Sequence, residues 1–273
     1  MSHLWHIRRK SLAHLGRRAL LRTGLRKRRA LRSAPYSPSA IPRVLWMYWE
    51  QGFANAPPIV QACVASWKAQ NPGWDIRLLD ATCVNAHVDC PALPEDALSA
   101  HRADVLRTRL LNVHGGVWAD ATTWCLRPLD EWLPILGYAG FFAFNWDNSD
   151  AQIISGSWPR KVGNWFIAAA AGNALIKEWD RISCDYWQGR ETAGNYFWHN
   201  DALEYAIGSL GEAAKVWDAM PKVSAGPAHF VWLALEHGQD EQAARDAIAT
   251  RSIPLQKLSW RMKASVGEIE AFF

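Results

Sequence analysis

Residues 101–124, HRADVLRTRLLNVHGGVWADATTW, decide the fold of this chain. The first part predicts an amphipathic helix, and Gly115 and Gly116 follow its last apolar residue, where a helix needs a left-handed cap. Residues 117–119 are apolar and predict a short buried strand that ends at Asp120. Ligands bind at the carboxyl ends of strands in open α/β sheets, so this stretch also predicts a functional site.

The predicted helix, roughly residues 95–113, carries an acidic and a basic side chain one turn apart. Asp104 and Arg107 share a face because they are three residues apart. Two interpretations stay open: a surface ion pair worth about 0.3 kcal/mol, or part of a site that includes Asp120. The helix is expected to bury a different stripe, made of Ala103, Leu106, Leu110 and Val113.

Upstream of this stretch, residues 41–79 predict a β-α-β unit. Residues 44–49 and 74–79 are the two strands, and residues 57–70 form the helix between them, which an Asn-Pro-Gly sequence ends. Such a unit implies parallel strands. Neither strand is followed by the glycine-rich dinucleotide fingerprint or by a P-loop, which disfavours nicotinamide enzymes and P-loop kinases.

Downstream, the pattern predicts two more strands and a mainly helical remainder. The strands are residues 141–145 and 165–169, a helix follows over 174–187, and residues 200–250 are largely helical. The helix is expected to turn one face inward, made of Leu175, Trp179, Ile182 and Tyr186. Most of the 17 tryptophans are expected in the core. Trp146, Trp187 and Trp198 are the candidates for stacking on a sugar ring.

Charge is distributed unevenly along the 273 residues. Residues 1–40 contain eleven of the 30 Lys and Arg side chains and none of the 26 Asp and Glu side chains. The rest of the chain is therefore acidic, which argues against a body that binds nucleic acid. We predict two parts: a basic amphipathic arm and linker over residues 1–40, and a folded domain over residues 41–273.

The arm alternates leucines with arginines, as in a helix that lies on an anionic lipid surface. This predicts a cytoplasmic protein held peripherally on the inner face of the membrane through residues 1–33. A solvated tail, a nucleic-acid-binding arm and an organellar transit peptide are the alternatives. No apolar run reaches the ~18 residues that span a bilayer.

Five cysteines without paired metal spacing fit a reducing compartment.

Asp120 and Thr122 lie on the same side of an extended chain, because side chains repeat every second residue. A carboxylate with a nearby oxygen suits a hard divalent cation, Mn²⁺ or Mg²⁺, that bridges a diphosphate. The alternative is that Asp120 only caps a turn at the end of the strand.

Four segments in this order resemble the capsular polysaccharide synthesis glycosyltransferases, which are related to the DxD-motif sugar transferases of the α-1,6-mannosyltransferase initiator type. They are IPRVLWMYWEQG (41–52), SWKAQNPGWDIRLLD (66–80), HRADVLRTRLLNVHGGVWADAT (101–122) and CLRPLDEW (125–132). Segments 141–145, 164–179 and 253–260 continue the likeness, which covers about residues 41–260.

The resemblance implies an α/β fold of GT-A type: a nucleotide-binding mixed or parallel sheet flanked by helices, with a largely helical C-terminal part. It implies a hexosyltransferase-like enzyme that moves a sugar, with retention, from a nucleotide sugar to a glycan or lipid-linked acceptor. Asp120 matches the first aspartate of the DxD motif and Asp104 the aspartate that contacts the nucleoside. The other residues expected on the donor side are Trp46, Tyr48, Trp49, Arg107, Gly115, Gly116 and Lys257.

Two positions depart from the pattern of the wider superfamily. Thr122 replaces the second aspartate of DxD, and Gln256 replaces a histidine. These changes leave open a metal-independent transfer, or a non-catalytic, membrane-tethered relative that binds nucleotide sugar or carbohydrate. On the acceptor side, Asp201 and His199 are the candidates for contact with the reacting centre. Asp201 is equally suited to cap a helix over residues 202–210.

Overall fold

A computed structural model of the chain describes residues 40–146, 160–208, 211–239 and 241–273. The chain divides into two units, Met1–Ser37 and Pro38–Phe273. The predicted arm lies outside the described residues apart from its last residue, so its helix and its membrane contact stay predictions. No helix within the described ranges is long and apolar enough to cross a membrane.

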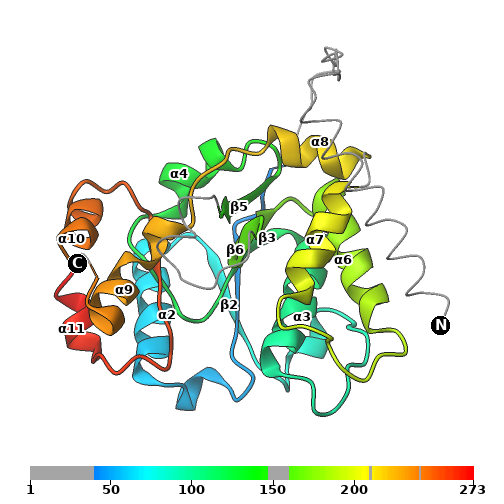
Figure 1. Cartoon of the computed structure of the whole chain (residues 1–273), viewed down its shortest axis with the longest axis horizontal. Coiled ribbons are helices and arrows are strands. Elements are labelled where there is room, and N and C mark those ends of the chain that lie inside the picture. The colour runs from blue at the N-terminus through cyan, green and yellow to red at the C-terminus, as the bar shows by residue number, and fades with distance from the viewer. Residues whose placement is uncertain (1–39, 147–159, 209–210, 240) are drawn as a thin grey trace. The chain divides into compact units, whose positions relative to one another are not determined.

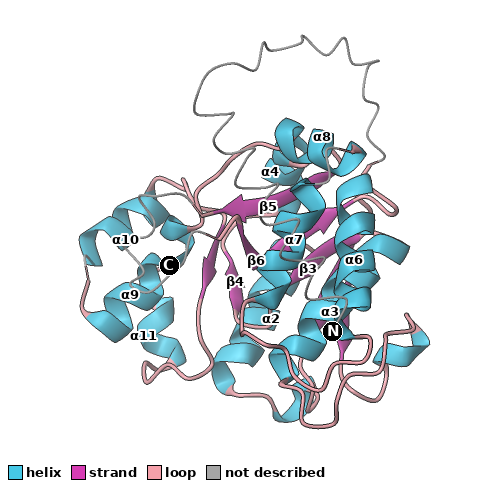
Figure 2. Cartoon of the chain, turned by 45° about the vertical axis from the view of Figure 1, so that its right-hand side comes forward, coloured by secondary structure: helices cyan, strands magenta, loops and turns pink. Residues whose placement is uncertain are grey.

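A five-stranded mixed sheet forms the centre of the second unit (Figure 2). Its strands run in the order β2 (Asp75–Leu79), β1 (Val44–Tyr48), β3 (Gly116–Ala119), β6 (Val162–Ala169) and β5 (Phe141–Asn145). Strand β1 pairs in parallel with β2 and β3, whereas β6 is antiparallel to β3 and β5. The predicted β-α-β unit and the mixed sheet are confirmed.

Helices cover both faces of this sheet (Figure 1). One face carries α3 (Ser99–His114), α6 (Ala174–Trp187), α7 (Trp198–Gly208) and α8 (Glu212–Ala219), and the other carries α2 (Pro58–Gln70) and α4 (Leu129–Leu136). Trp67 of α2 stacks on Phe166 of β6, with ring centroids 6.3 Å apart. Trp132 of α4 contacts the same ring at 5.4 Å. The predicted α/β class with flanking helices is therefore confirmed.

The C-terminal part is mainly helical, as expected, but it adds a two-stranded ribbon that the sequence did not indicate. Its helices are α9 (Phe230–His237), α10 (Glu241–Ala249) and α11 (Val266–Glu270). The ribbon pairs β4 (Thr123–Cys125) antiparallel with β7 (Leu255–Lys257), so Lys257 lies opposite Thr123. Single 3₁₀ turns occur at Phe53–Asn55, Val84–Ala86 and Gly226–His229. The ribbon therefore brings Lys257 beside Asp120.

The buried stripe predicted for helix α3 is partly wrong. It begins at Ser99, about four residues later than expected, and Val113 is 48% exposed although it was expected inside. Asp104 and Arg107 are buried instead. The reason is that Asn164 of β6 and His199 of α7 pack against this face of α3, while α6 covers another.

Helix α6 matches its predicted range but buries a partly different face. Leu175 and Trp179 are buried as expected, whereas Ile182 and Tyr186 are only half-buried. Ser183 and Trp187 occupy the buried positions in that half of the helix. The predicted face is wrong there because Trp187 packs in a cluster with Val105 of α3, Ala193 and Trp198, and Tyr186 lies at the edge of this cluster.

The two glycines after α3 are confirmed as the stop of the helix. Gly115 caps α3 with φ 69°, and Gly116 opens β3 with φ 100°. A Cβ atom on Gly116 would lie 2.4 Å from the Val44 carbonyl oxygen, so only glycine fits beside β1. The Trp46 indole N–H donates to the Gly115 carbonyl at 2.9 Å. This turn fixes where β3 begins and hence where Asp120, directly after the strand, lies.

Candidate active site

A cavity of about 840 Å³ opens at the carboxyl ends of β1 and β3, the edge where open α/β sheets bind ligands. Seven residues predicted for the site line this cavity: Tyr48, Trp49, Asp104, Arg107, Asp120, Thr122 and Lys257. They come from β1, α3, the turn after β3, and β7. The structure therefore brings together side chains more than 200 residues apart in the sequence.

Arg107 lies between two carboxylates at the base of the cavity. Its Nη2 atom is 3.3 Å from Asp104 Oδ1 and 3.5 Å from Asp120 Oδ1. The guanidinium also donates to the carbonyls of Ala103 and Asn164. Only 5% of this side chain is exposed, so the pair is not the solvated surface ion pair that was one interpretation of the sequence.

Asp104 is the buried carboxylate of the group. Burial raises the pKa of Asp104 to about 7, although the nearby Arg107 lowers it. Asn164 Nδ2 donates to Asp104 Oδ1 at 3.0 Å, and His199 Nδ1 lies 3.5 Å from the same atom. Burial holds the pKa of His199 well below its usual value, so this imidazole is neutral. A carboxyl group that titrates near pH 7 beside a cavity is typical of functional sites.

Asp120 is the carboxylate that reaches the cavity, with 27% of its side chain exposed. The Trp118 indole N–H donates to Oδ1 at 3.0 Å, and Lys257 Nζ lies 3.8 Å from Oδ2. The turn that follows β3 uses the Asp120 main-chain carbonyl, which accepts from the amide and hydroxyl of Thr123. The carboxylate is therefore not the acceptor of this turn and faces the ligand space.

Lys257 reaches the cavity from the ribbon and holds Thr122. Its Nζ atom donates to Thr122 Oγ1 at 2.7 Å and to the Leu258 carbonyl at 2.9 Å. Burial lowers the pKa of Lys257, and the Asp120 carboxylate opposes this shift. Thr122 itself is only 6% exposed.

These side chains do not fit a divalent cation as they stand. Thr122 Oγ1 already accepts from an ammonium group, and two cations lie within 4 Å of the Asp120 carboxylate. Gln256 is fully buried, where it accepts from the Val231 amide and donates to the Pro227 carbonyl. Within the described ranges, no group of three or more His, Cys, Asp or Glu side chains is placed to hold a metal.

Three residues expected on the donor side do not line the cavity. Trp46 is fully buried, with its ring 5.5 Å from those of His87 and His114, and it supports the turn at Gly115 and Gly116. Its expected place on the donor side is therefore wrong, because the side chain is fully buried in the core and does not line the cavity. The glycines act on the site by fixing the backbone in front of Asp120.

The two candidates for the acceptor side also lie outside the cavity wall. His199 is fully buried and stacks on Trp179 at 4.4 Å, and its Nε2 atom has no hydrogen-bond partner among the described residues. Asp201 is exposed and accepts from Asn195 Nδ2 at 3.0 Å. Helix α7 begins at Trp198, so Asp201 lies in its first turn and is not the predicted cap. Neither geometry supports contact with a reacting centre.

The tryptophans chosen for sugar stacking are also placed differently. Trp187 and Trp198 are buried in a small cluster with Val105, so stacking on a ligand is wrong for both. Trp146 is half-buried and packs against His229 at 5.1 Å. At the mouth of the cavity, Trp260 is 44% exposed and meets Trp49 edge-on at 6.1 Å.

Many residues that line the cavity were not predicted from the sequence, and three of them are Asn164, Arg160 and Asn200. Asn164 joins Asp104 to His199, and Arg160 lies over the Phe197 ring at 4.4 Å. Asn200 is 5% exposed, and its Oδ1 atom is buried with no hydrogen-bond partner in the described part of the chain. In the sequence, only its position next to the candidate Asp201 could have drawn attention to Asn200. Unpaired buried polar atoms in a cavity are suited to a polar ligand.

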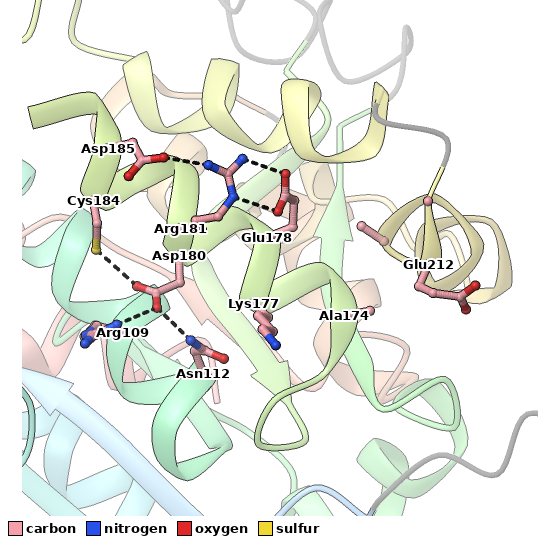
Figure 3. Close-up of a pocket in the computed structure, with 12 residues that line it drawn as sticks. Arg109, Asn112, Ala174, Lys177, Glu178, Asp180, Arg181, Cys184, Asp185 and Glu212 are labelled. Atoms are coloured by element: carbon pink, nitrogen blue, oxygen red, sulfur yellow. Dashed lines mark hydrogen bonds and ion pairs between the residues drawn. The ribbon is translucent and has the colours of Figure 1, made fainter.

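A second cavity, of about 550 Å³, lies between α3, α6 and the start of α8 (Figure 3). Asp180 at its wall accepts from Arg109 Nη1 at 3.1 Å, Asn112 Nδ2 at 2.7 Å and Cys184 Sγ at 3.5 Å. Nothing at this aspartate is left for a ligand to satisfy. We therefore assign the site to the first cavity.

The fold and the first cavity define an α/β protein with a ligand site of alternating acidic and basic side chains at the carboxyl edge of its sheet. A family model described as "Capsular polysaccharide synthesis protein" matches residues 9–273. The chain belongs to this family. The match confirms the resemblance and extends it into the arm and the C-terminal tail.

Relatives with curated names match part of the chain. "O-glycosyltransferase braB" of Annulohypoxylon truncatum is 29% identical over 178 residues, 57% of this chain and 40% of that protein. "Putative glycosyltransferase HOC1" of Saccharomyces cerevisiae is 29% identical over 171 residues, 56% of this chain and 42% of that protein. The chain thus spans less than half the length of these relatives. The solved structure "PaToxG Glycosyltransferase" aligns with a TM-score of 0.41 and 15% identity over 87% of this chain and 86% of that one.

Proposed function

We propose that this chain is a glycosyltransferase that moves a sugar from a nucleotide-sugar donor to a glycan or lipid-linked acceptor in surface polysaccharide synthesis. Membership of the family and the names of the relatives support the reaction class. One observation of the structure carries it: Asp104, Arg107, Asp120 and Lys257 meet in one cavity at the carboxyl edge of the sheet.

The cavity offers the charges that such a donor requires. A nucleotide sugar carries a diphosphate, for which Arg107 and Lys257 supply positive charge, and sugar hydroxyls, to which carboxylates such as Asp104 and Asp120 bind as acceptors. In the reaction the acceptor oxygen bonds to the anomeric carbon while the bond from that carbon to the diphosphate breaks. The electron pair passes to the leaving oxygen, and fixed cations there stabilise the charge.

The mouth of the cavity is suited to a sugar acceptor. Leu98, Tyr196, Phe197 and Trp260 are large apolar residues, each more than a third exposed, and all line this cavity. The flat apolar face of a pyranose packs on such rings, and a lipid carrier packs on the same surface. Retention of the anomeric configuration belongs to the proposal and rests on the family resemblance.

The proposal places the protein on the cytoplasmic face of the membrane through residues 1–33. The basic, acid-free composition of residues 1–40 supports this tether. Co-sedimentation with vesicles that contain anionic lipid tests it, with a chain lacking residues 1–33 for comparison. Equal sedimentation of the two proteins would remove the tether from the proposal.

Asp120→Ala tests the reaction. We expect transfer from UDP- or GDP-linked sugars, measured as released nucleoside diphosphate, to fall about 100- to 1,000-fold, the loss typical when one electrostatic group of an active site is removed. Asp96→Ala, a change at an exposed loop residue outside the cavity, is the control and should keep full activity.

Two outcomes would contradict this assignment. Full transfer by Asp120→Ala would show that the cavity is not the active site. Donor binding without any release of nucleotide by the unmodified chain would favour the alternative, a non-catalytic relative that binds nucleotide sugar or carbohydrate. A rise in unfolding temperature with the donor measures binding separately from turnover.

A further inference from the structure

A lysine ammonium group lies beside both residues expected to bind a metal, Asp120 and Thr122. Lys257 Nζ donates to Thr122 Oγ1 at 2.7 Å and lies 3.8 Å from Asp120 Oδ2. It thus contacts the first residue of the expected DxD-like pair and hydrogen-bonds to the last. A divalent cation bound by Asp120 and Thr122 would have to lie beside this ammonium group and close to Arg107.

We propose that the ammonium group of Lys257 takes the place of a divalent metal ion, so that this pocket binds the donor diphosphate without metal. The inference rests on the proposed function and names the group that offsets the charge of the leaving diphosphate. Thr122 fits this assignment, because the pocket has one carboxylate fewer than a site of two aspartates, while two cations, Arg107 and Lys257, lie beside Asp120.

The main chain holds Lys257 in this position. Strand β7 pairs with β4, and their register places Lys257 opposite Thr123, next to the residue whose hydroxyl it binds. The side chain is 18% exposed, and its second hydrogen bond goes to the Leu258 carbonyl. A preorganised charge of this kind needs no rearrangement when a ligand arrives.

Two N–H groups of this ammonium group have partners among the described residues, and one remains for a ligand. A lysine side chain has three donors, and Thr122 and the Leu258 carbonyl take two of them. The distance of 3.8 Å to Asp120 Oδ2 is too long for a hydrogen bond. The third N–H is therefore available to a phosphate oxygen in the cavity that Lys257 lines.

Arg107 supplies the second cation and lies on the other side of Asp120. It is 3.5 Å from Oδ1, whereas Lys257 is nearest to Oδ2. In the transfer step the bond between the anomeric carbon and the diphosphate oxygen breaks, and its electron pair stays on that oxygen. The acceptor hydroxyl loses its proton to the released diphosphate or to water, and Lys257 keeps all its protons.

The test is calorimetric binding of UDP and GDP to the full chain, in excess EDTA and in excess Mn²⁺. We expect one of these nucleotides to bind equally well in both. Lys257→Met should weaken this binding about 10- to 100-fold, the range of a lost hydrogen bond to a charged group. Lys257→Arg should restore most of the affinity, and Lys263→Met, at an exposed lysine, is the matched control.

A second variant covers the case in which Lys257→Met does not fold. Lys257→Gln keeps an amide that can donate to Thr122 and to the Leu258 carbonyl but removes the charge. It should lose affinity while circular dichroism shows a folded chain. Combining Lys257→Gln with Thr122→Asp rebuilds a two-carboxylate site, whose nucleotide binding should depend on Mn²⁺.

The outcomes separate this inference from the proposed function. Binding that occurs only with Mn²⁺ in the unmodified chain, or unchanged affinity in folded Lys257→Met and Lys257→Gln, would overturn the role of Lys257 and keep the glycosyltransferase proposal. No binding of any nucleoside diphosphate or nucleotide sugar in either condition would overturn both.

Discussion

Two arginines of helix α3, Arg107 and Arg109, each bind a buried aspartate, and the two groups differ in what they leave for a ligand. Toward the large cavity, Arg107 lies between Asp104 and Asp120. Toward α6, Arg109 binds Asp180, whose side chain is 2% exposed (Figure 3). The two arginines are only two residues apart on one helix, although the Arg107 side chain is 5% exposed and that of Arg109 is 34% exposed.

The difference lies in how fully each carboxylate is satisfied. Asp180 accepts from an arginine, an asparagine and a thiol, and burial raises the pKa of that Cys184 thiol to about 12, so it stays protonated and keeps donating. Asp104 has a pKa raised to about 7, and Asp120 keeps part of its surface in the cavity. A satisfied buried charge stabilises structure, whereas an unsatisfied one is available for chemistry.

The strongest test of this comparison is the pair Arg107→Met and Arg109→Met. Arg109→Met leaves Asp180 buried without its cation and should lower the free energy of unfolding by about 3 kcal/mol. Affinity for UDP or GDP should stay within about twofold, because Arg109 does not line the large cavity. Arg107→Met should cost stability too, but it should also slow transfer about 100-fold.

Urea unfolding and nucleotide-release assays on the folded variants separate these effects. Both variants remove one guanidinium from the same helix, so each is the control for the other. If folded Arg109→Met loses transfer as severely as Arg107→Met, the cavity between α3 and α6 takes part in function, and the distinction between the two groups fails.

The sequence predicted the elements whose signals are local. The run of apolar residues, the Gly115-Gly116 stop and the strand before Asp120 together placed one carboxylate correctly at the edge of the sheet. Each of these depends on neighbours within a few residues, where periodicity and backbone preference act. The Asp104 and Arg107 face was also identified, but an i, i+3 pair does not reveal whether another helix covers it.

What could not be predicted depends on contacts between distant segments. Strands β4 and β7 have three residues each and lie about 130 residues apart, so no alternation shows that Lys257 reaches Thr122. Asn200 was missed in favour of the neighbouring Asp201 because one residue around a helix changes the direction of a side chain by about 100°. Which of these two side chains, Asn200 or Asp201, lines the cavity depends on the exact position of α7, which begins at Trp198.

Asp104→Asn should change the stability of the folded chain by an amount that depends on pH and is smaller than the effects of the arginine variants. With a pKa of about 7 in the folded chain and about 3.9 when unfolded, the native state holds more protons between these values. Stability therefore falls as pH rises from about 4 to 7. Asparagine has no such titration, so the variant should match the unmodified chain near pH 4 and exceed it by about 1–3 kcal/mol, a few degrees in Tm, near pH 8.

The unmodified chain is the control for this measurement, because the other groups around Asp104 are the same in both proteins. Arg107, Asp120 and His199 face it and are the same in both proteins, so the difference between their Tm values at each pH isolates Asp104. A difference in Tm that stays constant from pH 4 to pH 8 would show that the pKa of Asp104 is not raised in the folded chain. The variant should also bind UDP or GDP sugars more weakly, because the amide lacks the carboxylate charge that accepts from sugar hydroxyls. Stability gained and donor affinity lost in one substitution would be the mark of a carboxylate kept for function.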